Sequence, residues 1–333
     1  MAATAIAESR PLALVIGGLG YVGQAVTERL LAGGFRIRCV DSLLHGQKPP
    51  ETLISHPDFE LVTADIRDGR KMELLVRDPD AILLLAGLVG EAACEREPGE
   101  TLQTNLLAPL SIWEAALYHG RAERFLFVSS DSCYGKRPGE VLYETSRLAP
   151  CSLYASLKAR TEQRILASSP RGTFPKPVIL RLATVYGYSP RMRFDLAANL
   201  LVREATLKRR LIVHSGEQWR PFVHVRDAAE AFYLALAAPL QAVAGEVFNV
   251  GSNDLNVQFK DLGALIASQC EGAELTFSPG EPDLRDYRVD FSKIREILDF
   301  QPRTSLADGL AGIRDAILAG VFPDPYSPLY RNA

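Results

Sequence analysis

A tyrosine and a lysine stand four residues apart, at Tyr154 and Lys158, in the pattern Y-x-x-x-K. They fall in a stretch of good helix formers at 154–166, so we expect them to share one helix face. An ammonium beside a phenol favours the phenolate and is expected to lower the pKa of Tyr154 from about 10 toward neutral pH. Such a tyrosine can take the proton of an alcohol while hydride leaves the carbon, or return it in the reverse step. An ordinary surface helix is the alternative for this pair alone.

Serines near the middle of the chain favour the chemical interpretation. The stretch FLFVSSDSCYG, residues 125–135, places Ser129, Ser130 and Ser132 just beyond an apolar run that is long enough for a strand. A hydroxyl at that position can hydrogen-bond the reacting oxygen. Serines after a strand are also common turn residues, so a catalytic role depends on their combination with the tyrosine and the lysine.

A glycine-rich turn near the start of the chain is the second chemical signature. GGLGYVG follows an apolar run and gives Gly17, Gly20 and Gly23 at the start of a helical stretch. Glycine allows a tight turn and a close approach of the backbone to a pyrophosphate, and the helix N-terminus offers free N–H groups and partial positive charge. A purely structural glycine turn is the alternative.

An aspartate at the end of the next apolar run indicates which dinucleotide is bound. Asp41 lies 18 residues beyond Gly23, as expected for a carboxylate that holds an adenosine ribose. An acid at this position repels a 2′-phosphate, and Ser42 and the two leucines after it supply no cation to bind one. The sequence therefore predicts NAD rather than NADP.

Alternating strand and helix patterns must position these residues. Apolar runs of strand length occur at 12–16, 36–40, 59–63, 81–85 and 125–129, and helical stretches at 21–31, 68–76 and 101–117. Runs that are apolar throughout fit strands buried on both faces of a parallel sheet, and their alternation with helices predicts an α/β fold with a Rossmann-type, doubly wound sheet. The carboxyl ends of all the strands then meet at the edge where ligands bind.

The pattern loosens after residue 170, where Pro and Gly become frequent and the elements shorten. Further strands are expected at 178–182 and 246–250, and helices at 227–236 and 257–268. We predict an NAD-binding domain at 1–180, with 221–250 interleaved back into it. A smaller α/β substrate-binding lobe, toward the C-terminus, is predicted from 181–220 and 251–333.

Composition excludes several classes of protein. The 333 residues carry 37 basic and 40 acidic side chains, a formal charge of −3, which argues against nucleic acid or an anionic membrane as the main partner. The longest apolar run is roughly half of what a bilayer crossing needs, and residues 1–10 do not have the pattern of a secretion signal, so we expect a cytoplasmic protein. Five scattered cysteines without a C-x-x-C pair predict neither a disulfide framework nor a metal site.

Together these motifs closely resemble the extended short-chain dehydrogenase/reductases, specifically the NAD-dependent epimerase/dehydratase family that acts on nucleotide sugars. The resemblance runs from Leu12 to about Leu318. Its further landmarks are ADIRD at 64–68, LLAGLVG at 84–90, YASLK at 154–158, LRLATVYG at 180–187, GEQWRPFVHVRD at 216–227, EVFNVG at 246–251 and YRVDFSKI at 287–294.

The resemblance implies roles for individual residues. Ser130 matches the family's catalytic Ser/Thr, with Asp131 and Ser132 beside it. Contacts with the cofactor are expected for Gly17, Gly20, Tyr21, Val22, Gly23, Asp41, Ser42, Asp65, Ile66, Ala86, Gly87, Asn105, Tyr154 and Lys158. Asn199 and Arg220 match positions that bind the nucleotide's diphosphate. The helices around 101–117 and 154–166 correspond to a four-helix homodimer interface in similar proteins.

The chain also departs from the family's patterns. Dehydratases of the dTDP-glucose type have Thr-Asp-Glu where this chain has Ser130, Asp131 and Ser132, so the Glu that removes the C5 proton is replaced by a hydroxyl. A hydroxyl alone is too weak a base, which disfavours standard 4,6-dehydration and glutamate-dependent decarboxylation. Thr184 stands where UDP-galactose 4-epimerases have a substrate Asn. Gly280 replaces a frequent Arg, so diphosphate contacts are expected from Arg285 or Arg288.

Two arginines in the stretch SPRMRFD, residues 189–195, are further substrate-binding candidates. The guanidinium fork of Arg191 or Arg193 suits the geometry of a phosphate. Solvated loop arginines are the alternative.

The sequence therefore predicts an NAD-dependent 4-epimerase of a nucleotide-linked hexose. NAD accepts hydride from C4 with Tyr154 as the base, and the hydride returns to the opposite face of the 4-keto intermediate. A 4-ketoreductase, or a variant dehydratase that uses Asp131, is the alternative within this class. A non-catalytic NAD-binding regulatory or scaffold protein is the alternative from another class.

Overall fold

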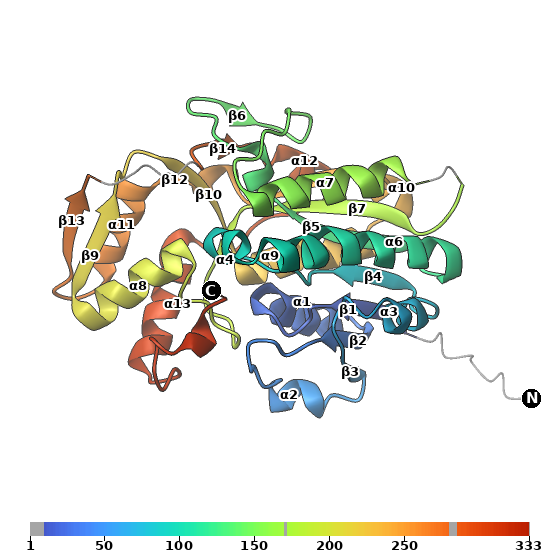
Figure 1. The fold of residues 1–333 in the computed structure, drawn as a ribbon. Coiled ribbons are helices and arrows are strands. Elements are labelled where there is room, and N and C mark those ends of the chain that lie inside the picture. Colours follow the sequence, from blue (N-terminus) through green and yellow to red (C-terminus); the bar gives the residue numbers. More distant parts are fainter. Residues whose placement is uncertain (1–9, 170–171, 280–284, 333) are drawn as a thin grey trace, which may run out of the picture.

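A seven-stranded parallel sheet forms the centre of the computed structural model, which describes residues 10–169, 172–279 and 285–332 (Figure 1). Its strand order is β11-β7-β5-β4-β1-β2-β3. The bounds are β1 Leu12–Ile16, β2 Arg36–Asp41, β3 Phe59–Thr63, β4 Ala81–Leu84, β5 Arg124–Ser130, β7 Lys176–Leu182 and β11 Val247–Val250. This is the predicted Rossmann-type sheet.

Helices cover both faces of the sheet. Alternate residues of each central strand point to opposite faces, so each face packs against its own layer of helices. Ala13 and Val15 of β1 pack with α1 (Tyr21–Ala32), α9 (Val225–Ala237) and α12 (Ser292–Leu298). Leu14 and Ile16 pack with α3 (Gly69–Leu75), α6 (Ala108–His119) and α7 (Leu153–Ala167). A fully buried strand therefore needs no polar face, as its apolar sequence indicates.

The lobe has its own hydrophobic core and three small sheets. The core joins α8 (Ala197–Lys208), α11 (Phe259–Gln269) and α13 (Leu306–Leu318). Beside them run β8 (Thr184–Tyr186), β10 (Trp219–His224) and β12 (Asn256–Gln258) in one sheet, and β9 (Arg210–His214) with β13 (Glu274–Ser278) in another. The third pairs β14 (Arg288–Val289) with β6 (Val141–Leu142).

Most predicted elements match the structure, and two differ. The first five strands agree within one residue. The helix expected at 101–117 is a longer helical run, in which α5 (Pro98–Leu102) and α6 are joined by a π-helical turn at Gln103–Leu107. The helix expected at 257–268 begins at Phe259, because Asn256–Gln258 forms an antiparallel ladder with β10. The division of the chain into two domains at residue 180 stays a prediction.

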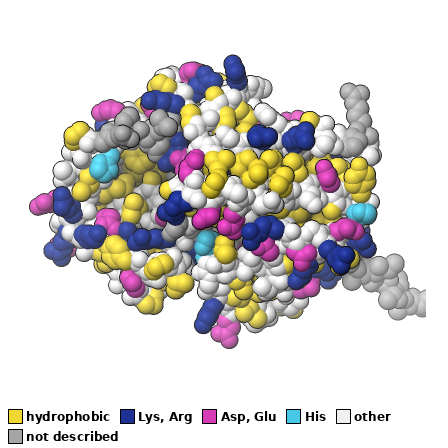
Figure 2. Space-filling model, viewed as in Figure 1, with side chains coloured by type: hydrophobic (Ala, Val, Ile, Leu, Met, Phe, Trp, Pro, Cys, Tyr) yellow, Lys and Arg dark blue, Asp and Glu magenta, His cyan; other side chains and the backbone are white. Residues whose placement is uncertain are grey.

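The remaining short elements connect these layers. They are α2 (Glu51–Ile54), α4 (Glu91–Arg96) and α10 (Leu240–Val243), and single 3₁₀ turns at Asp131–Tyr134, Asn253–Leu255 and Pro328–Tyr330. No helix within the described ranges is both long and apolar enough to cross a bilayer. Figure 2 shows acidic and basic side chains interspersed over one face of the molecule.

Candidate active site

A cavity of about 720 Å³ lies at the carboxyl edge of the central sheet, between the sheet and the lobe. Its wall combines the turns after β1, β2, β4 and β5 with the start of α7 and several lobe segments. Most of the residues predicted to bind cofactor or to act in catalysis line it: Gly17, Gly20, Tyr21, Val22, Gly23, Asp41, Ser42, Asp65, Ile66, Ala86, Gly87, Ser130, Asp131, Ser132, Tyr154 and Lys158. Thr184, Arg191, Arg193, Arg220 and Arg285, predicted to bind substrate, line it too.

The glycine turn is packed so closely that side chains cannot replace its glycines. Gly17 has φ +86°, and a Cβ there would lie 2.5 Å from the backbone N of Ala86. A Cβ on Gly23 would lie 2.0 Å from the carbonyl O of Gly17. Helix α1 begins directly after Gly20, which has no side chain to cap it, so the N–H groups of its first turn adjoin the cavity. These features fit the pyrophosphate of a dinucleotide.

Asp41 closes the same end of the cavity at the tip of β2. Its carboxylate accepts hydrogen bonds from the backbone N–H groups of Leu19 and Leu43, at 3.0 and 2.9 Å, and from the amide of Gln47 at 3.1 Å. Burial raises the pKa of Asp41, against the smaller lowering effects of the Leu43 and Leu19 N–H groups and of the charge of Arg191. The carboxylate is therefore fixed in place beside the glycine turn, as a ribose-binding acid must be.

Asn105, which was expected to contact the cofactor, lies behind the wall of the cavity. It is buried and does not line the cavity. Its side-chain O accepts from the N–H of Leu88, and its amide donates to the carbonyl of the same residue, both at 2.8 Å. Asn105 therefore holds the loop after β4 in place, and Ala86 and Gly87 of that loop line the cavity.

The catalytic candidates Ser130, Tyr154 and Lys158 all line this cavity. Helix α7 begins just before Tyr154 because Ser152 caps it, accepting a hydrogen bond from the N–H of Ala155 at 3.3 Å. Tyr154 is half-buried. Lys158 is buried, and its ammonium donates to the carbonyl of Val128 on β5 at 3.0 Å. This bond ties the helix to the strand that carries the serines.

The expected pKa of Tyr154 is wrong for the structure as described. Burial raises this pKa, the neighbouring Cys133, Cys94 and Asp131 raise it further, and the charge of Arg193 lowers it. The Lys158 ammonium lies 6.0 Å from the centre of the tyrosine ring and is held by a backbone carbonyl. Burial also lowers the pKa of Lys158 to about 8. The lysine charge therefore does not dominate the phenol.

Ser130 ends β5 and begins the turn that carries its two neighbours. Its hydroxyl O accepts from the hydroxyl of Ser132 at 2.8 Å and from the N–H of the same residue at 3.2 Å. The hydroxyl of Ser132 is thus directed to Ser130. Cys133, one residue further, is fully buried and does not line the cavity.

Asp131 is a buried carboxylate at the lobe end of the cavity. One oxygen accepts from Ser130 at 3.4 Å, and the other has no hydrogen-bond partner among the described residues. Burial raises the pKa of Asp131 to about 6, against the lowering effects of Arg220, Tyr287 and Arg285. A buried carboxylate whose pKa is near neutrality is suited to acid–base work.

Two residues predicted to bind the substrate's diphosphate do not line the cavity. Asn199 is fully buried: its side-chain O accepts from the N–H of Gly187 at 3.1 Å, and its amide donates to Tyr21 and to the carbonyl of Arg193. Arg288 lies over the Trp219 ring, 5.3 Å from its centre, and its guanidinium donates to the carbonyl of Gly139. Both side chains therefore contact other residues of the protein and not the cavity.

Several lining residues escaped the sequence analysis, among them Tyr287, Glu91 and Asn332. Tyr287 is buried and approaches Asp131 because β14, which follows it, pairs with β6 from the middle of the chain. Glu91 forms an ion pair with Arg285 at 3.6 Å. No local pattern marks these positions, since each depends on contacts between distant segments.

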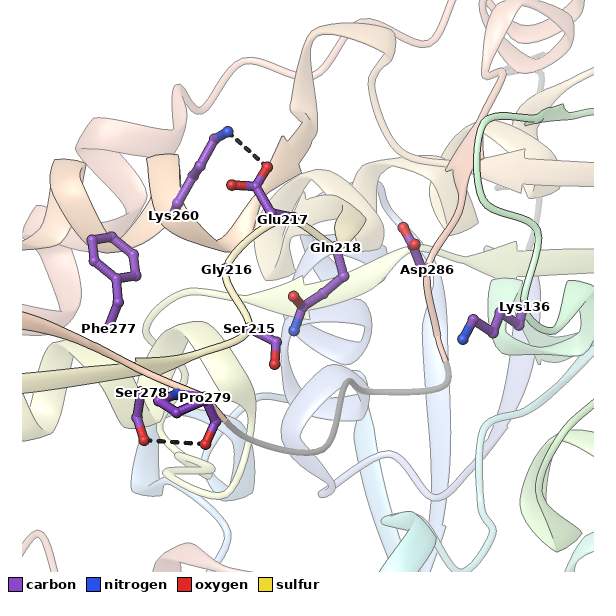
Figure 3. Close-up of a pocket in the computed structure, with 10 residues that line it drawn as sticks. All are labelled: Lys136, Ser215, Gly216, Glu217, Gln218, Lys260, Phe277, Ser278, Pro279 and Asp286. Atoms are coloured by element: carbon purple, nitrogen blue, oxygen red, sulfur yellow. Dashed lines mark hydrogen bonds and ion pairs between the residues drawn. The ribbon is translucent and has the colours of Figure 1, made fainter.

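The structure holds a second cavity, of about 640 Å³ (Figure 3). It is lined by the loop between β9 and β10, the end of β13 and the start of α11, and its charged side chains are Glu217, Lys260, Asp286 and Lys136. Gln218 and Lys260 line this cavity, whereas Arg220 and Phe259, their near neighbours in the chain, line the first. Residues near the start of β10 and at the start of α11 therefore line both cavities.

Among the described residues, no three His, Cys, Asp or Glu side chains gather in a way that could hold a metal ion.

Comparison with known proteins places the chain in one family. The family model described as "NAD dependent epimerase/dehydratase family" matches residues 13–251. A UDP-glucose 4-epimerase of Mycolicibacterium smegmatis is 30% identical over 305 residues, covering 90% of this chain and 96% of the relative. A UDP-N-acetyl-alpha-D-glucosaminuronate decarboxylase of Bacillus cytotoxicus is 28% identical over 315 residues, covering 89% and 94%.

Solved structures agree with this fold. The UDP-glucose 4-epimerase of Thermotoga maritima, solved with UDP-glucose, superposes with a TM-score of 0.80 at 27% identity, covering 93% of this chain and all of that one. The UDP-glucuronic acid 4-epimerase of Bacillus cereus, solved with UDP-glucuronic acid and NAD, gives a TM-score of 0.80 at 25% identity, covering 92% and 99%. Relatives thus include both epimerases and decarboxylases.

Proposed function

Because this chain belongs to the NAD dependent epimerase/dehydratase family, and is therefore an NAD-dependent enzyme, we propose that it is a nucleotide-sugar 4-epimerase. The observation that carries the proposal is the meeting of Ser130, Tyr154 and Lys158 in the cavity that the glycine turn and Asp41 also line. NAD, when bound, supplies a hydride acceptor and donor. The glycine turn and Asp41 are suited to hold its pyrophosphate and ribose, and Lys158 its second ribose.

The side chains of the site then handle the proton. Tyr154 takes the proton from the C4 hydroxyl and returns it when the hydroxyl is restored, and Ser130 hydrogen-bonds the same oxygen. Because burial raises the pKa of Tyr154, this exchange requires cationic help, and Arg193 is the cavity residue whose charge already lowers that pKa. Retained cofactor suits such a cycle, since it involves no net oxidation.

The substrate's nucleoside diphosphate fits the lobe end of the cavity. Arg220 and Arg285 both line it, and the Arg220 guanidinium donates to the backbone carbonyl of Arg285 at 2.7 Å. Two guanidinium groups suit a diphosphate. The second cavity has Gln218, two residues before Arg220, and Lys260 in its wall (Figure 3). We place the nucleoside there, with the hexose between Arg220 and Tyr154.

A variant dehydratase is the second candidate, and one observation favours it. Asp131 has an unpartnered carboxylate oxygen and a pKa raised to about 6, which suits a general acid that protonates a leaving hydroxyl. The presence of Ser132 where such dehydratases have a glutamate argues against it, because the Ser132 hydroxyl is a weak base and donates to Ser130.

Products distinguish these functions directly. The purified protein is denatured and assayed for released NAD, and the native protein is incubated with UDP-, dTDP-, GDP- and CDP-hexoses. We expect bound NAD and conversion of one nucleotide sugar to its C4 epimer, with no added cofactor consumed. A 4-keto-6-deoxy product would instead support the dehydratase. Bound NAD without turnover of any sugar in the panel would contradict both and favour a non-catalytic role.

Two further properties complete the proposal. We propose a homodimer that forms through α6 and α7, over which hydrophobic side chains gather in Figure 2. Leu107, in the turn leading into α6, is 45% exposed and would be covered by such a partner. We also propose that the enzyme works in the cytoplasm, where the described cysteines, all free, remain reduced.

A further inference from the structure

The segment Pro328–Asn332, here called the strap, is held on the lobe beside the cavity. The carbonyl of Tyr330 accepts from the N–H of Phe194 at 2.9 Å. The rings of these two residues also pack edge to face with Phe322, with centroids 5.1 to 5.8 Å apart. The strap is thereby fixed to residues 189–195, the stretch SPRMRFD.

Arg191 anchors the end of the strap. Its guanidinium donates to the side-chain O of Asn332 at 2.7 Å and to the carbonyl of Arg331 at 3.3 Å, and its other nitrogen donates to the carbonyl of Met192. Asp195 accepts from the N–H of Asn332 at 3.4 Å. Arg191 is 4% exposed, so these bonds replace its contact with water. Its fork fixes both the backbone and the side chain of the strap.

The same residues reach across to the cofactor half of the molecule. The hydroxyl of Ser189 donates to the carbonyl of Tyr21, and the N–H of Arg191 donates to the side chain of Gln24, both on α1. In the strap, Leu329 lies 3.6 Å from the position of a Cβ on Gly46, in the loop after β2. The strap therefore bridges the lobe and the loop that carries Ser42 to Gln47.

Asn332 lines the cavity, together with Asp41 and His45. The charge of Arg191 influences the pKa of both those side chains, which places the anchor at the Asp41 end. Asn332 is half-buried, and no described residue accepts a hydrogen bond from its amide nitrogen. A donor is thus held at the wall, with its oxygen engaged and its N–H₂ group available.

We propose that Asn332 is a cofactor-binding residue, positioned by Arg191, that donates a hydrogen bond to an oxygen on the adenosine side of NAD and slows its release. The inference rests on the proposed function for the placement of adenosine at Asp41. Under this proposal Arg191 acts at the cofactor end of the cavity and does not bind the substrate.

Release of NADH measures this role without any sugar. The protein is loaded with NADH and mixed with excess NAD, and the decay of bound-NADH fluorescence gives the dissociation rate. We expect Asn332→Ala to release NADH about five- to tenfold faster, as the loss of one hydrogen bond predicts. Asn332→Asp keeps the oxygen that Arg191 binds but removes the donor, so it is expected to release NADH at least as fast.

The matched control is Arg331→Ala, which removes a neighbouring exposed side chain that does not line the cavity and leaves the strap backbone intact. It is expected to release NADH at the unmodified rate. Arg191→Lys keeps the charge but loses the fork, so it should match Asn332→Ala, and the double variant should be no faster than either. If Arg191→Lys fails to fold, the release rates of the Asn332 variants still test the role of Asn332.

Opposite results separate the possible failures. Release from Asn332→Ala and Asn332→Asp within twofold of the Arg331→Ala rate would overturn the role of Asn332, even if Tyr154→Phe abolishes turnover. Fast release from the Asn332 variants combined with unchanged turnover of Tyr154→Phe would uphold the strap and overturn the proposed chemistry. Failure of the unmodified protein to bind NADH would overturn both.

Discussion

The two ends of the main cavity are built in different ways. At the cofactor end, Gly17 and Ala86 follow strands of the central sheet and Asp41 ends one, and all three come from the first part of the chain. At the lobe end, Asp131, Arg220 and Tyr287 come from segments far apart in the sequence, which meet through the pairing of β14 with β6. These residues of the cofactor end can therefore be recognised from local sequence patterns, whereas those of the lobe end come together only in the assembled fold.

The two buried carboxylates show the same contrast in their chemistry. Asp41 accepts hydrogen bonds from two backbone N–H groups and a side-chain amide, which fixes it as a binding group. Asp131 keeps one oxygen without a partner among the described residues, and its pKa is raised to about 6. A fully bonded carboxylate positions a ligand, whereas an under-bonded one can exchange a proton near neutral pH.

The largest expected effect lies at the cofactor end. Gly23→Ala places a Cβ 2.0 Å from the carbonyl O of Gly17, and because the obstacle is backbone, the whole turn must shift. We expect a loss of about 3 kcal/mol in the free energy of unfolding, and loss of NAD from the purified protein. Urea unfolding and assay of released NAD measure the two effects.

Gly312→Ala is the matched control from the lobe. Gly312 lies within α13, and no atom lies within 4 Å of a Cβ added there. The substitution is expected to stabilise the protein by about 0.5–1 kcal/mol, since alanine favours a helix, and to leave bound NAD unchanged. Equal damage from both substitutions would show that the glycine turn is no more constrained than the lobe.

A smaller effect, which depends on pH, is expected at the lobe end. The pKa of Asp131 is about 6 in the folded chain and about 3.9 when unfolded. Between these pH values the folded chain retains a proton that the unfolded chain has lost, so stability falls as pH rises from about 4 to 6. The difference corresponds to about 2–3 kcal/mol, which Asp131→Asn should remove.

Urea unfolding at pH 4 and at pH 7 tests this expectation. Relative to the unmodified protein, Asp131→Asn should gain about 2–3 kcal/mol of stability between the two pH values. Asp254→Asn, which changes an exposed carboxylate, should not show this gain. A stability difference for Asp131→Asn that is the same at both pH values would mean that Asp131 ionises as an exposed aspartate does.

Sequence patterns predicted the cofactor end well because its signals are local. The apolar run at β1, the glycine turn and the position of Asp41 specify a strand, a turn and a strand end within a short stretch of chain. The pair of Tyr154 and Lys158 was found from its helical spacing for the same reason. Both lie in the cavity as expected.

The lobe end was predicted less well because its contacts are not local. Asn199 and Arg288 were expected to contact the diphosphate, but in the structure they hydrogen-bond residues from distant segments and do not line the cavity. Tyr287 gives no signal until β14 pairs with β6. The pKa of Tyr154 was misjudged because spacing along a helix gives proximity to Lys158 but neither the burial of the ring nor the carbonyl that holds the ammonium.

The most direct test of reversible hydride transfer at C4, with Tyr154 as the base, uses a label at C4. The enzyme is given its nucleotide sugar with deuterium at C4, and the product is analysed for the C4 epimer and for retained deuterium. We expect an epimer that keeps its deuterium. It should form at least about 100-fold more slowly with Tyr154→Phe and at the normal rate with Tyr143→Phe, a tyrosine that lines neither cavity. Deuterium lost to solvent, or full turnover by Tyr154→Phe, would contradict it.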